Sequence, residues 1–388
     1  MAHSREGSTT QLLQFCAGYF TSYTIFSVLT KWFTEHPDRT TAVMKDLEYT
    51  VYTTIGGMAV CLAVVIVLGW YRLESNNRVR LGGMTFPREI YYIIPSGICT
   101  AVVIPTTTLM YTLPISVMVA MVIMRGLVIV IGRLVDAVQI RQGILHKNVY
   151  WQENVAVAFA IVAVSTTIFL GSSTGKDGNF DFVRNPTAMT ILGSYVAAYA
   201  IRIYVMNYYK NTRPKGVKQD NKGFFAIEQI AATVTLVIAG ALVFLAPGIA
   251  GWTAEETPAQ ITQYRDSLIA LKPMWFGAMM AGGLFGVVAF FSVFLFMFKG
   301  RTATFAGLVN RLTSLIAGTT ATVVFWLGLG GKAPKTQDWV SLGLVLIAVG
   351  FLTVAERRRA AELEVTHELE AAPAETGAAP TGASTQPA

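Results

Sequence analysis

The stretch Phe305-Ala306-Gly307-Leu308-Val309-Asn310-Arg311-Leu312 lies inside an apolar run, residues 302–327, that is long enough to cross a lipid bilayer. Arg311 follows Arg301 by ten residues, which is about 15 Å along a helix and about half of a hydrocarbon core of about 30 Å. A permanent cation at this depth costs about 2.5–3.5 kcal/mol on insertion scales. Because of that cost, an arginine at mid-membrane indicates a functional site.

An earlier run, residues 115–135, repeats several features of this stretch and reads ISVMVAMVIMRGLVIVIGRLV. Arg125 lies within it at a similar depth. Gly132 follows Arg125 by seven residues, as Gly318 follows Arg311 by seven. A tryptophan then follows each arginine, 26 and 28 residues later, just before the next apolar run. Matching features in one order indicate an internal repeat, which is typical of secondary transporters.

The composition is that of a polytopic membrane protein. Of 388 residues, 53% are hydrophobic and 14% are charged, and the mean hydropathy is +0.50. Soluble domains carry about 25% charged residues. The net charge of +7 is spread as membrane topology requires, so we expect no nucleic-acid partner. The three cysteines all lie in apolar runs and form neither a metal motif nor a disulfide framework, so we expect no metal and no cofactor.

Ten apolar runs can be counted, and most have about the 20 residues that a spanning helix needs. The first run lacks a signal-peptide cleavage pattern and is better interpreted as a retained helix. The fold class predicted is therefore an all-α polytopic membrane protein with ten transmembrane helices. The runs are residues 12–32, 51–71, 90–110, 115–135, 151–170, 188–208, 224–245, 274–298, 302–327 and 339–354.

The distribution of basic residues predicts the orientation of these helices. Of the 30 Lys and Arg, 18 fall in one set of alternate loops and termini and 9 in the other. The remaining three, Arg125, Arg202 and Arg311, lie within the runs. The positive-inside rule then places both termini in the cytoplasm. The helices of Arg125 and Arg311 would run in opposite directions, so the two five-helix halves are expected to be inverted repeats with a binding site at midplane.

This topology divides the chain into the following segments: a cytoplasmic N-terminus, residues 1–10; a first five-helix repeat, 11–171; an external loop, 172–187; a second five-helix repeat, 188–355, with an external loop, 246–272; and a cytoplasmic tail, 356–388. The 246–272 loop is either a mobile cap or contains a short interfacial helix within residues 255–271. The tail begins as a charged, helix-like stretch. Its remainder is rich in Pro, Ala, Gly and Thr, which predicts disorder.

Little in the sequence favours an enzyme. All four histidines fall outside the apolar cores, and no nucleophile, metal or phosphate-loop motif is present. Acidic residues are also absent from the mid-helix positions, where a proton-coupled pump normally places Asp, Glu or His. This pattern favours a uniporter or an exchanger.

Arg125 and Arg311 have no carboxylate at their own depth in the sequence, and two interpretations stay open for them. In the structural one, each guanidinium binds carbonyls of a broken helix or stacks on an aromatic ring. In the functional one, the guanidinium fork binds a phosphate or carboxylate of a substrate. Asn310 adds an amide beside Arg311 that can donate or accept a hydrogen bond.

Arg202 lies eight residues before Lys210, so its side chain is expected to reach the cytoplasmic interface. Tyr195 and Tyr199 share a helical face with Arg202. The first helix repeats the same four-residue spacing with two tyrosines, Tyr19 and Tyr23. These four rings either pack as core and interfacial anchors or line a wet cavity and stack on a substrate.

Two segments carry a resemblance to a known family. GLVNRLTSLIAG resembles the Gly-Ala-Leu-Asn-Lys motif in the penultimate helix of nucleotide-sugar transporters, and MIMRGLVIV resembles an arginine-bearing helix of related carriers. Ten spans, the tight YTLPIS link and internal termini resemble the drug/metabolite transporter superfamily. The resemblance implies that Gly307, Asn310 and Arg311 contact the diphosphate or sugar. Leu, Val and Arg replace Ala, Leu and Lys of the motif, and Arg for Lys changes the binding geometry.

The function expected is alternating-access transport of a small organic anion, such as a nucleotide-sugar or another phosphorylated metabolite, by exchange across the plasma (inner) membrane. Arg311 and Asn310 would be the main ligands, with Arg125 as a second cation and the four tyrosines around the rest of the substrate. One alternative is an exporter of amino acids or small metabolites with the same fold. Another is a membrane scaffold or lipid-handling protein that transports nothing.

Overall fold

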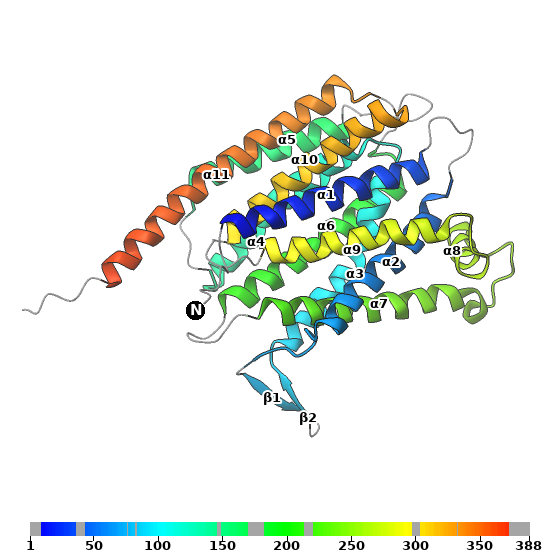
Figure 1. The fold of residues 1–388 in the computed structure, drawn as a ribbon, viewed down its shortest axis with the longest axis horizontal. Helices are drawn as coiled ribbons and strands as arrows, with labels where there is room; N and C mark the ends of the chain where they lie inside the picture. Colours follow the sequence, from blue (N-terminus) through cyan, green and yellow to red (C-terminus); the bar gives the residue numbers. More distant parts are fainter. Residues whose placement is uncertain are drawn as a thin grey trace, which may run out of the picture.

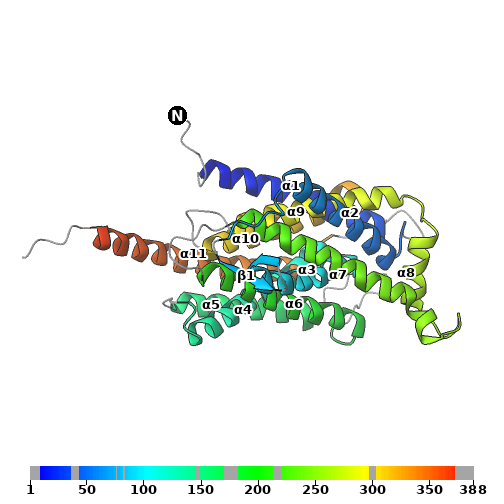
Figure 2. The same cartoon turned by 90° about the horizontal axis from the view of Figure 1, so that it is seen from below.

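The fold is described from a computed structural model (Figures 1 and 2), which describes residues 9–35, 43–75, 77–81, 84–145, 149–169, 182–212, 220–296, 303–331 and 333–371. Within these residues the chain forms eleven helices and one β-hairpin. The elements are α1 Thr9–Thr34, α2 Asp46–Val67, β1 Arg78–Leu81, β2 Met84–Pro87, α3 Ile90–Thr112, α4 Val117–Arg141, α5 Trp151–Phe169, α6 Pro186–Asn211, α7 Asn221–Ala250, α8 Ala259–Ile269, α9 Trp275–Phe296, α10 Ala303–Leu329 and α11 Thr336–Ala371.

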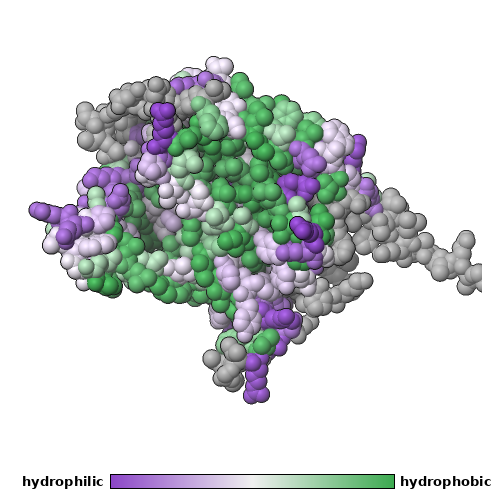
Figure 3. Space-filling view, turned by 180° about the vertical axis from the view of Figure 1, so that it is seen from behind, coloured by the Kyte–Doolittle hydropathy of each residue, from purple (hydrophilic) through white to green (hydrophobic). Residues whose placement is uncertain are grey.

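Ten of these helices, all except α8, are long and apolar enough to cross a membrane, which confirms the ten predicted spans. They extend between the two ends of one bundle, and Figure 1 shows that α1 begins and α11 ends at the same end, hereafter the termini end. The hydrophobic side chains exposed on α7 include Val237, Ile238 and Leu242. One face of the molecule is broadly hydrophobic between hydrophilic ends (Figure 3). The protein is therefore a multi-pass integral membrane protein.

Local sequence sets where several helices begin. The side chain of Ser116 accepts a hydrogen bond from Val119 N (3.2 Å) at the start of α4. Asn185 caps α6 in the same way, and Pro186 occupies the first turn, where its missing N–H costs nothing. Asp220 caps α7 through Gly223 N (2.9 Å). These caps satisfy N–H groups that would otherwise be unpaired at the membrane boundary.

The closest packing in the bundle joins α2 to α9. A Cβ on Gly56 would lie 1.9 Å from the carbonyl oxygen of Met279, and a Cβ on Gly282 would lie 2.0 Å from that of Thr53. Any side chain at these positions would force the backbones apart, so only glycine permits this approach. On its other face α9 packs against α1, which in turn packs against α10.

The structure adds elements that the ten-run prediction does not contain. A β-hairpin pairs β1 with β2 between α2 and α3, so the fold is not entirely helical. The loop 246–272 contains α8, at the end opposite to the termini (Figure 1). Tyr52 of α2 donates to the carbonyl of Ser267 in α8 (2.6 Å), so this loop holds a short, anchored helix.

The predicted tail, N-terminus and first external loop are only partly covered by the described residues. The charged stretch after Arg359 is helical and continues α11 to Ala371. Residues 372–388 of the tail lie outside the described residues, as do residues 1–8 of the N-terminus and 172–181 of the first external loop.

Candidate functional site

Two tyrosine hydroxyls of α1 accept hydrogen bonds from Arg125 of α4 in the interior of the bundle. Arg125 Nη2 donates to the hydroxyls of Tyr23 (3.2 Å) and Tyr19 (3.5 Å), both from α1. The Tyr23 hydroxyl also shares a hydrogen bond of 2.5 Å with the hydroxyl of Tyr111, from α3. The guanidinium carbon lies 5.9 Å from the centre of the Tyr23 ring. Hydroxyl groups and the face of an aromatic ring therefore stabilise this buried charge, instead of a carboxylate.

The second predicted tyrosine pair completes this cluster from α6. Tyr195 and Tyr199 stack in a tilted geometry with ring centroids 5.2 Å apart. Both are almost fully buried, and both lie close enough to Arg125 for an electrostatic interaction. The four tyrosines chosen from their spacing thus converge on one arginine, and Tyr111 is a fifth that the spacing did not indicate.

Asn310 connects the tyrosine cluster to α9. Its Oδ1 accepts from the Tyr19 hydroxyl (3.5 Å), and its Nδ2 donates to Ser292 Oγ (3.0 Å). The side chain is fully buried. Because both ends of the amide already have partners in the protein, Asn310 positions Tyr19 and α10 in this structure.

Arg311 is the partly exposed cation of the site. Its side chain reaches across to α4, where Nη2 lies 3.0 Å from the place that a Cβ on Gly132 would occupy. The glycine therefore provides the space for the guanidinium. Arg311 is close enough to Arg125, Tyr199 and Asp136 for electrostatic interactions. Gly132 follows Arg125 by seven residues, so Arg311 contacts α4 at a level about 10 Å along the helix from the Arg125 backbone.

Both arginines keep donors that the protein does not use. The Nε atoms of Arg125 and Arg311 are buried without a hydrogen-bond partner. Among the described residues, neither arginine forms an ion pair with a carboxylate. Gly307 lies in the early part of α10, and its surroundings are outside the described part of the structure. The site is thus a net positive region with hydroxyls and aromatic rings, which suits an anion that also carries a flat or polar group.

The prediction that Arg202 reaches the cytoplasmic interface is wrong. Arg202 is 8% exposed and forms two hydrogen bonds of 2.9 Å with Glu228 of α7, from Nε to Oε1 and from Nη2 to Oε2. Ser96 (2.7 Å) and Thr100 (3.1 Å) of α3 donate to the same carboxylate. This ion pair holds α3, α6 and α7 together. Glu228 lies two turns into α7 and is fully buried, so Arg202 has a partner inside the bundle.

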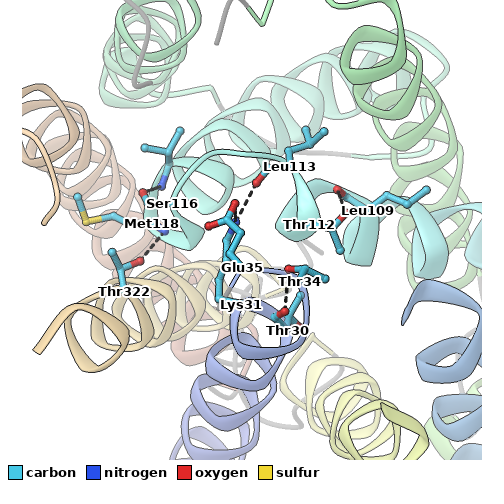
Figure 4. A network of polar contacts seen from close by, with 11 residues as sticks. Thr30, Lys31, Thr34, Glu35, Leu109, Thr112, Leu113, Ser116, Met118 and Thr322 are labelled. Atoms are coloured by element: carbon cyan, nitrogen blue, oxygen red, sulfur yellow. Dashed lines mark hydrogen bonds and ion pairs between the residues drawn. The ribbon is translucent and has the colours of Figure 1, made fainter. Parts of the chain in front are cut away.

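A second polar network closes the end of the bundle opposite to the termini (Figure 4). Lys31 at the end of α1 donates to the carbonyl of Leu113, which follows α3 (2.8 Å), and to Glu35 Oε1 (2.9 Å). Thr322 of α10 accepts from the backbone N–H of Met118 in the first turn of α4 (2.9 Å). Lys31 is only 3% exposed. These bonds join α1 to the link between α3 and α4, and α4 to α10, on one side of the arginine site.

In the part of the chain that the structure describes, no group of three or more His, Cys, Asp or Glu residues is placed to bind a metal ion. The thiols of Cys16, Cys61 and Cys99 are free.

Comparisons with known proteins add the following. No protein-family model matches the chain. No curated protein matches it. A solved structure described as "Crystal structure of protein" is similar to it, with 15% sequence identity over 90% of this chain and 99% of that chain and a TM-score of 0.47. The class that the described fold defines is a multi-pass integral membrane protein with ten candidate spans.

Proposed function

We propose that this protein is a secondary transporter of the drug/metabolite transporter superfamily that moves a small organic anion by alternating access. The observation that carries the proposal is the state of Arg311, a permanent cation placed inside a membrane bundle. The residue is partly exposed, its Nε is buried without a hydrogen-bond partner, and it forms no ion pair among the described residues. A cation inside a membrane bundle is costly, and such a residue is by default a hypothesis for a binding site.

The geometry favours a phosphorylated anion as the substrate. A guanidinium fork binds phosphate or carboxylate oxygens bidentately, and two such groups at different levels of α4 suit an extended anion. The paired rings of Tyr195 and Tyr199 are buried beside Arg125 in this structure, and a flat base would stack on them when the site opens. A nucleotide-sugar has both features. Exchange of one anion for another would also avoid moving the empty, doubly positive site across the membrane.

The packing of the helices supports two inverted five-helix repeats. Inverted repeats pair α1 with α6, α2 with α7, α3 with α9, α4 with α10 and α5 with α11. Under this pairing, α1 packs against α9 and α10, as α6 packs against α3 and α4. Likewise α2 packs against α9, as α7 packs against α3. The arginine site lies where α4 and α10 meet, as expected at a repeat interface.

The asymmetry of the same packing supports alternating access. The Lys31 network closes the bundle at the end opposite to the termini, where α1 also contacts α3. The repeat relates the pair α1 and α3 to the pair α6 and α9. In the described part of the chain, α6 and α9 make no comparable contact. If the protein lies in the plasma membrane with both termini in the cytoplasm, the closed end faces outward. The site then opens toward the cytoplasm.

Thermal unfolding of the purified protein against a ligand panel tests this function. The panel contains nucleotide-sugars, nucleotide monophosphates, sugar phosphates, amino acids and cationic drugs. A ligand at 100 times its dissociation constant stabilises the folded state by about 2.7 kcal/mol, a readily measured shift. Stabilisation by a phosphorylated anion supports the proposal. Stabilisation by amino acids alone identifies an exporter of zwitterions, and a flat response across the panel together with inactive proteoliposomes identifies a scaffold.

Replacing Lys31 with methionine is expected to open the outer side. Methionine keeps the apolar stem but loses the hydrogen bonds to the Leu113 carbonyl and Glu35. In a background without the native cysteines, a cysteine at Ser27, which is fully buried one turn from Lys31, should react several-fold faster with an impermeant thiol reagent added outside. The matched control is Lys45→Met at the same end, where the side chain is exposed. Equal reaction rates in both variants would show that Lys31 does not hold the outer side closed.

A further inference from the structure

The β1–β2 hairpin is the part of the described structure that leaves the helix bundle sideways. It connects the end of α2 to the start of α3, so its base lies at the level where two spans leave the membrane. Figure 1 shows it extending away from the bundle beyond α2 and α3, at a steep angle to α7 and α9. Tyr71 and Tyr91 flank it and are largely exposed, and exposed tyrosines at a span end are typical of the headgroup level.

The base of the hairpin is fixed to the bundle. Ser75 Oγ donates to the carboxylate of Glu89 (2.7 Å), which is 5% exposed at the start of α3. Arg88 N donates to the carbonyl of Asn77 (2.9 Å), which closes the neck of the hairpin. Asp220, the cap of α7, accepts from Glu74 N (3.0 Å). The direction in which the hairpin leaves the bundle is therefore set by hydrogen bonds to α3 and α7.

The two faces of the hairpin differ in polarity. Val79 pairs with Phe86, and Arg80 pairs with Thr85, so one face carries an apolar pair and the other carries an arginine and a threonine. Phe86 remains 36% exposed, so the bundle does not cover the apolar face. An isolated two-stranded hairpin is marginally stable in water, and an apolar face needs something to pack against.

Exposed arginines lie on the opposite face of the hairpin and beside its strands. Arg72, Arg78, Arg80 and Arg88 are all exposed, and none forms an ion pair within the described residues. Arg72 lies over the ring of Tyr71 (5.7 Å) and keeps its charge available. Of the nearby acids, Glu89 is already bound by Ser75. The surface therefore combines an apolar patch with unpaired guanidinium groups at the level of the headgroups.

We propose that the β1–β2 hairpin lies on the membrane surface at the termini end and binds anionic lipids. Val79 and Phe86 enter the boundary between headgroups and acyl chains, and Arg78, Arg80 and Arg88 bind lipid phosphates. The bilayer is the partner that fits because it is already adjacent to the hairpin through α2 and α3, and its charge complements the arginines. This role is independent of what the arginine site inside the bundle transports.

Site-directed spin labelling of the full chain in nanodiscs tests where the two faces lie. In a background without native cysteines, nitroxides are placed at Thr85 and Phe86, neighbours that point to opposite faces of β2. With phosphatidylcholine and phosphatidylglycerol nanodiscs, the label at 86 should be accessible mainly to oxygen, and the label at 85 mainly to a water-soluble nickel chelate. Equal access of the chelate to both labels would overturn the proposal, because the hairpin would then project into water.

The charge component has its own test with a matched control. Spin-labelled phosphatidylglycerol should be immobilised around the wild-type protein, and Arg78→Gln with Arg80→Gln should lower that fraction several-fold. Arg141→Gln with Arg357→Gln removes the same charge from exposed positions at the same end and should have little effect. High salt should weaken the wild-type binding. Equal losses in the two double variants would show that overall charge, and not the hairpin, attracts the lipid.

Discussion

Replacing Arg311 with alanine is expected to abolish transport while leaving the folded protein intact. A hydrogen bond to a charged group contributes about 1.5–3 kcal/mol, and a bidentate contact contains two. Loss of the guanidinium should therefore lower the affinity for a phosphorylated anion by about 10–100-fold or more. The measurement is uptake into proteoliposomes together with the ligand-induced shift in unfolding temperature. Arg141→Ala, an exposed arginine at the end of α4, is the control and should behave as wild type.

The stability of the ligand-free protein separates the two interpretations of Arg311. The cation has no ion pair among the described residues, and its buried Nε lacks a partner. Removing it should leave the unfolding temperature without ligand unchanged or raised, as is common when a functional charge is deleted. Arg311→Lys should keep part of the affinity, because it retains charge but loses the fork. If Arg311→Ala unfolds readily without ligand, or still binds the anion like wild type, the binding role is wrong.

Replacing Arg202 with methionine is expected to destabilise the protein by about 3–5 kcal/mol. Glu228 would remain fully buried with Ser96 and Thr100 but without its cation. An uncompensated carboxylate in the bundle is costly, and α3, α6 and α7 would lose the ion pair that joins them. Thermal unfolding in detergent measures the loss.

The double variant Arg202→Met with Glu228→Gln is the control for this ion pair. The glutamine is neutral and can still accept hydrogen bonds from Ser96 and Thr100, so most of the stability should return. Ligand binding should also persist in the double variant, because Arg202 belongs to the ion pair and not to the anion site. A single Arg202 variant as stable as wild type would contradict this account of the pair.

Much of the candidate site could be predicted from spacing alone. The four-residue intervals of Tyr19 with Tyr23 and Tyr195 with Tyr199 put each pair on one helical face, and all four rings do surround Arg125. The depth of Arg125 followed from counting residues along its run. These properties are local to one helix, where a fixed rise and a fixed turn convert sequence distance into position.

The hairpin between α2 and α3 was missed although a signal for it exists. Residues 78–81 alternate arginine with an apolar residue, Gly82 and Gly83 follow, and a short apolar stretch comes next. A Gly-Gly pair between alternating segments predicts a hairpin. The ten long apolar runs dominate the composition, so the short basic segment was counted only for its charge.

The sequence by itself indicated a membrane protein with ten spans, because about 20 consecutive apolar residues are what a helix needs to cross a bilayer. It also placed Arg125 and Arg311 deep in their helices. Only the tertiary structure decided which groups the buried cations contact. Arg202 pairs with Glu228, Arg311 lies against Gly132, and Lys31 donates to the carbonyl of Leu113. The physical reason is that position along a helix follows from a constant rise per residue. Which helix lies opposite depends on close packing between distant segments, such as the glycine contact of α2 with α9.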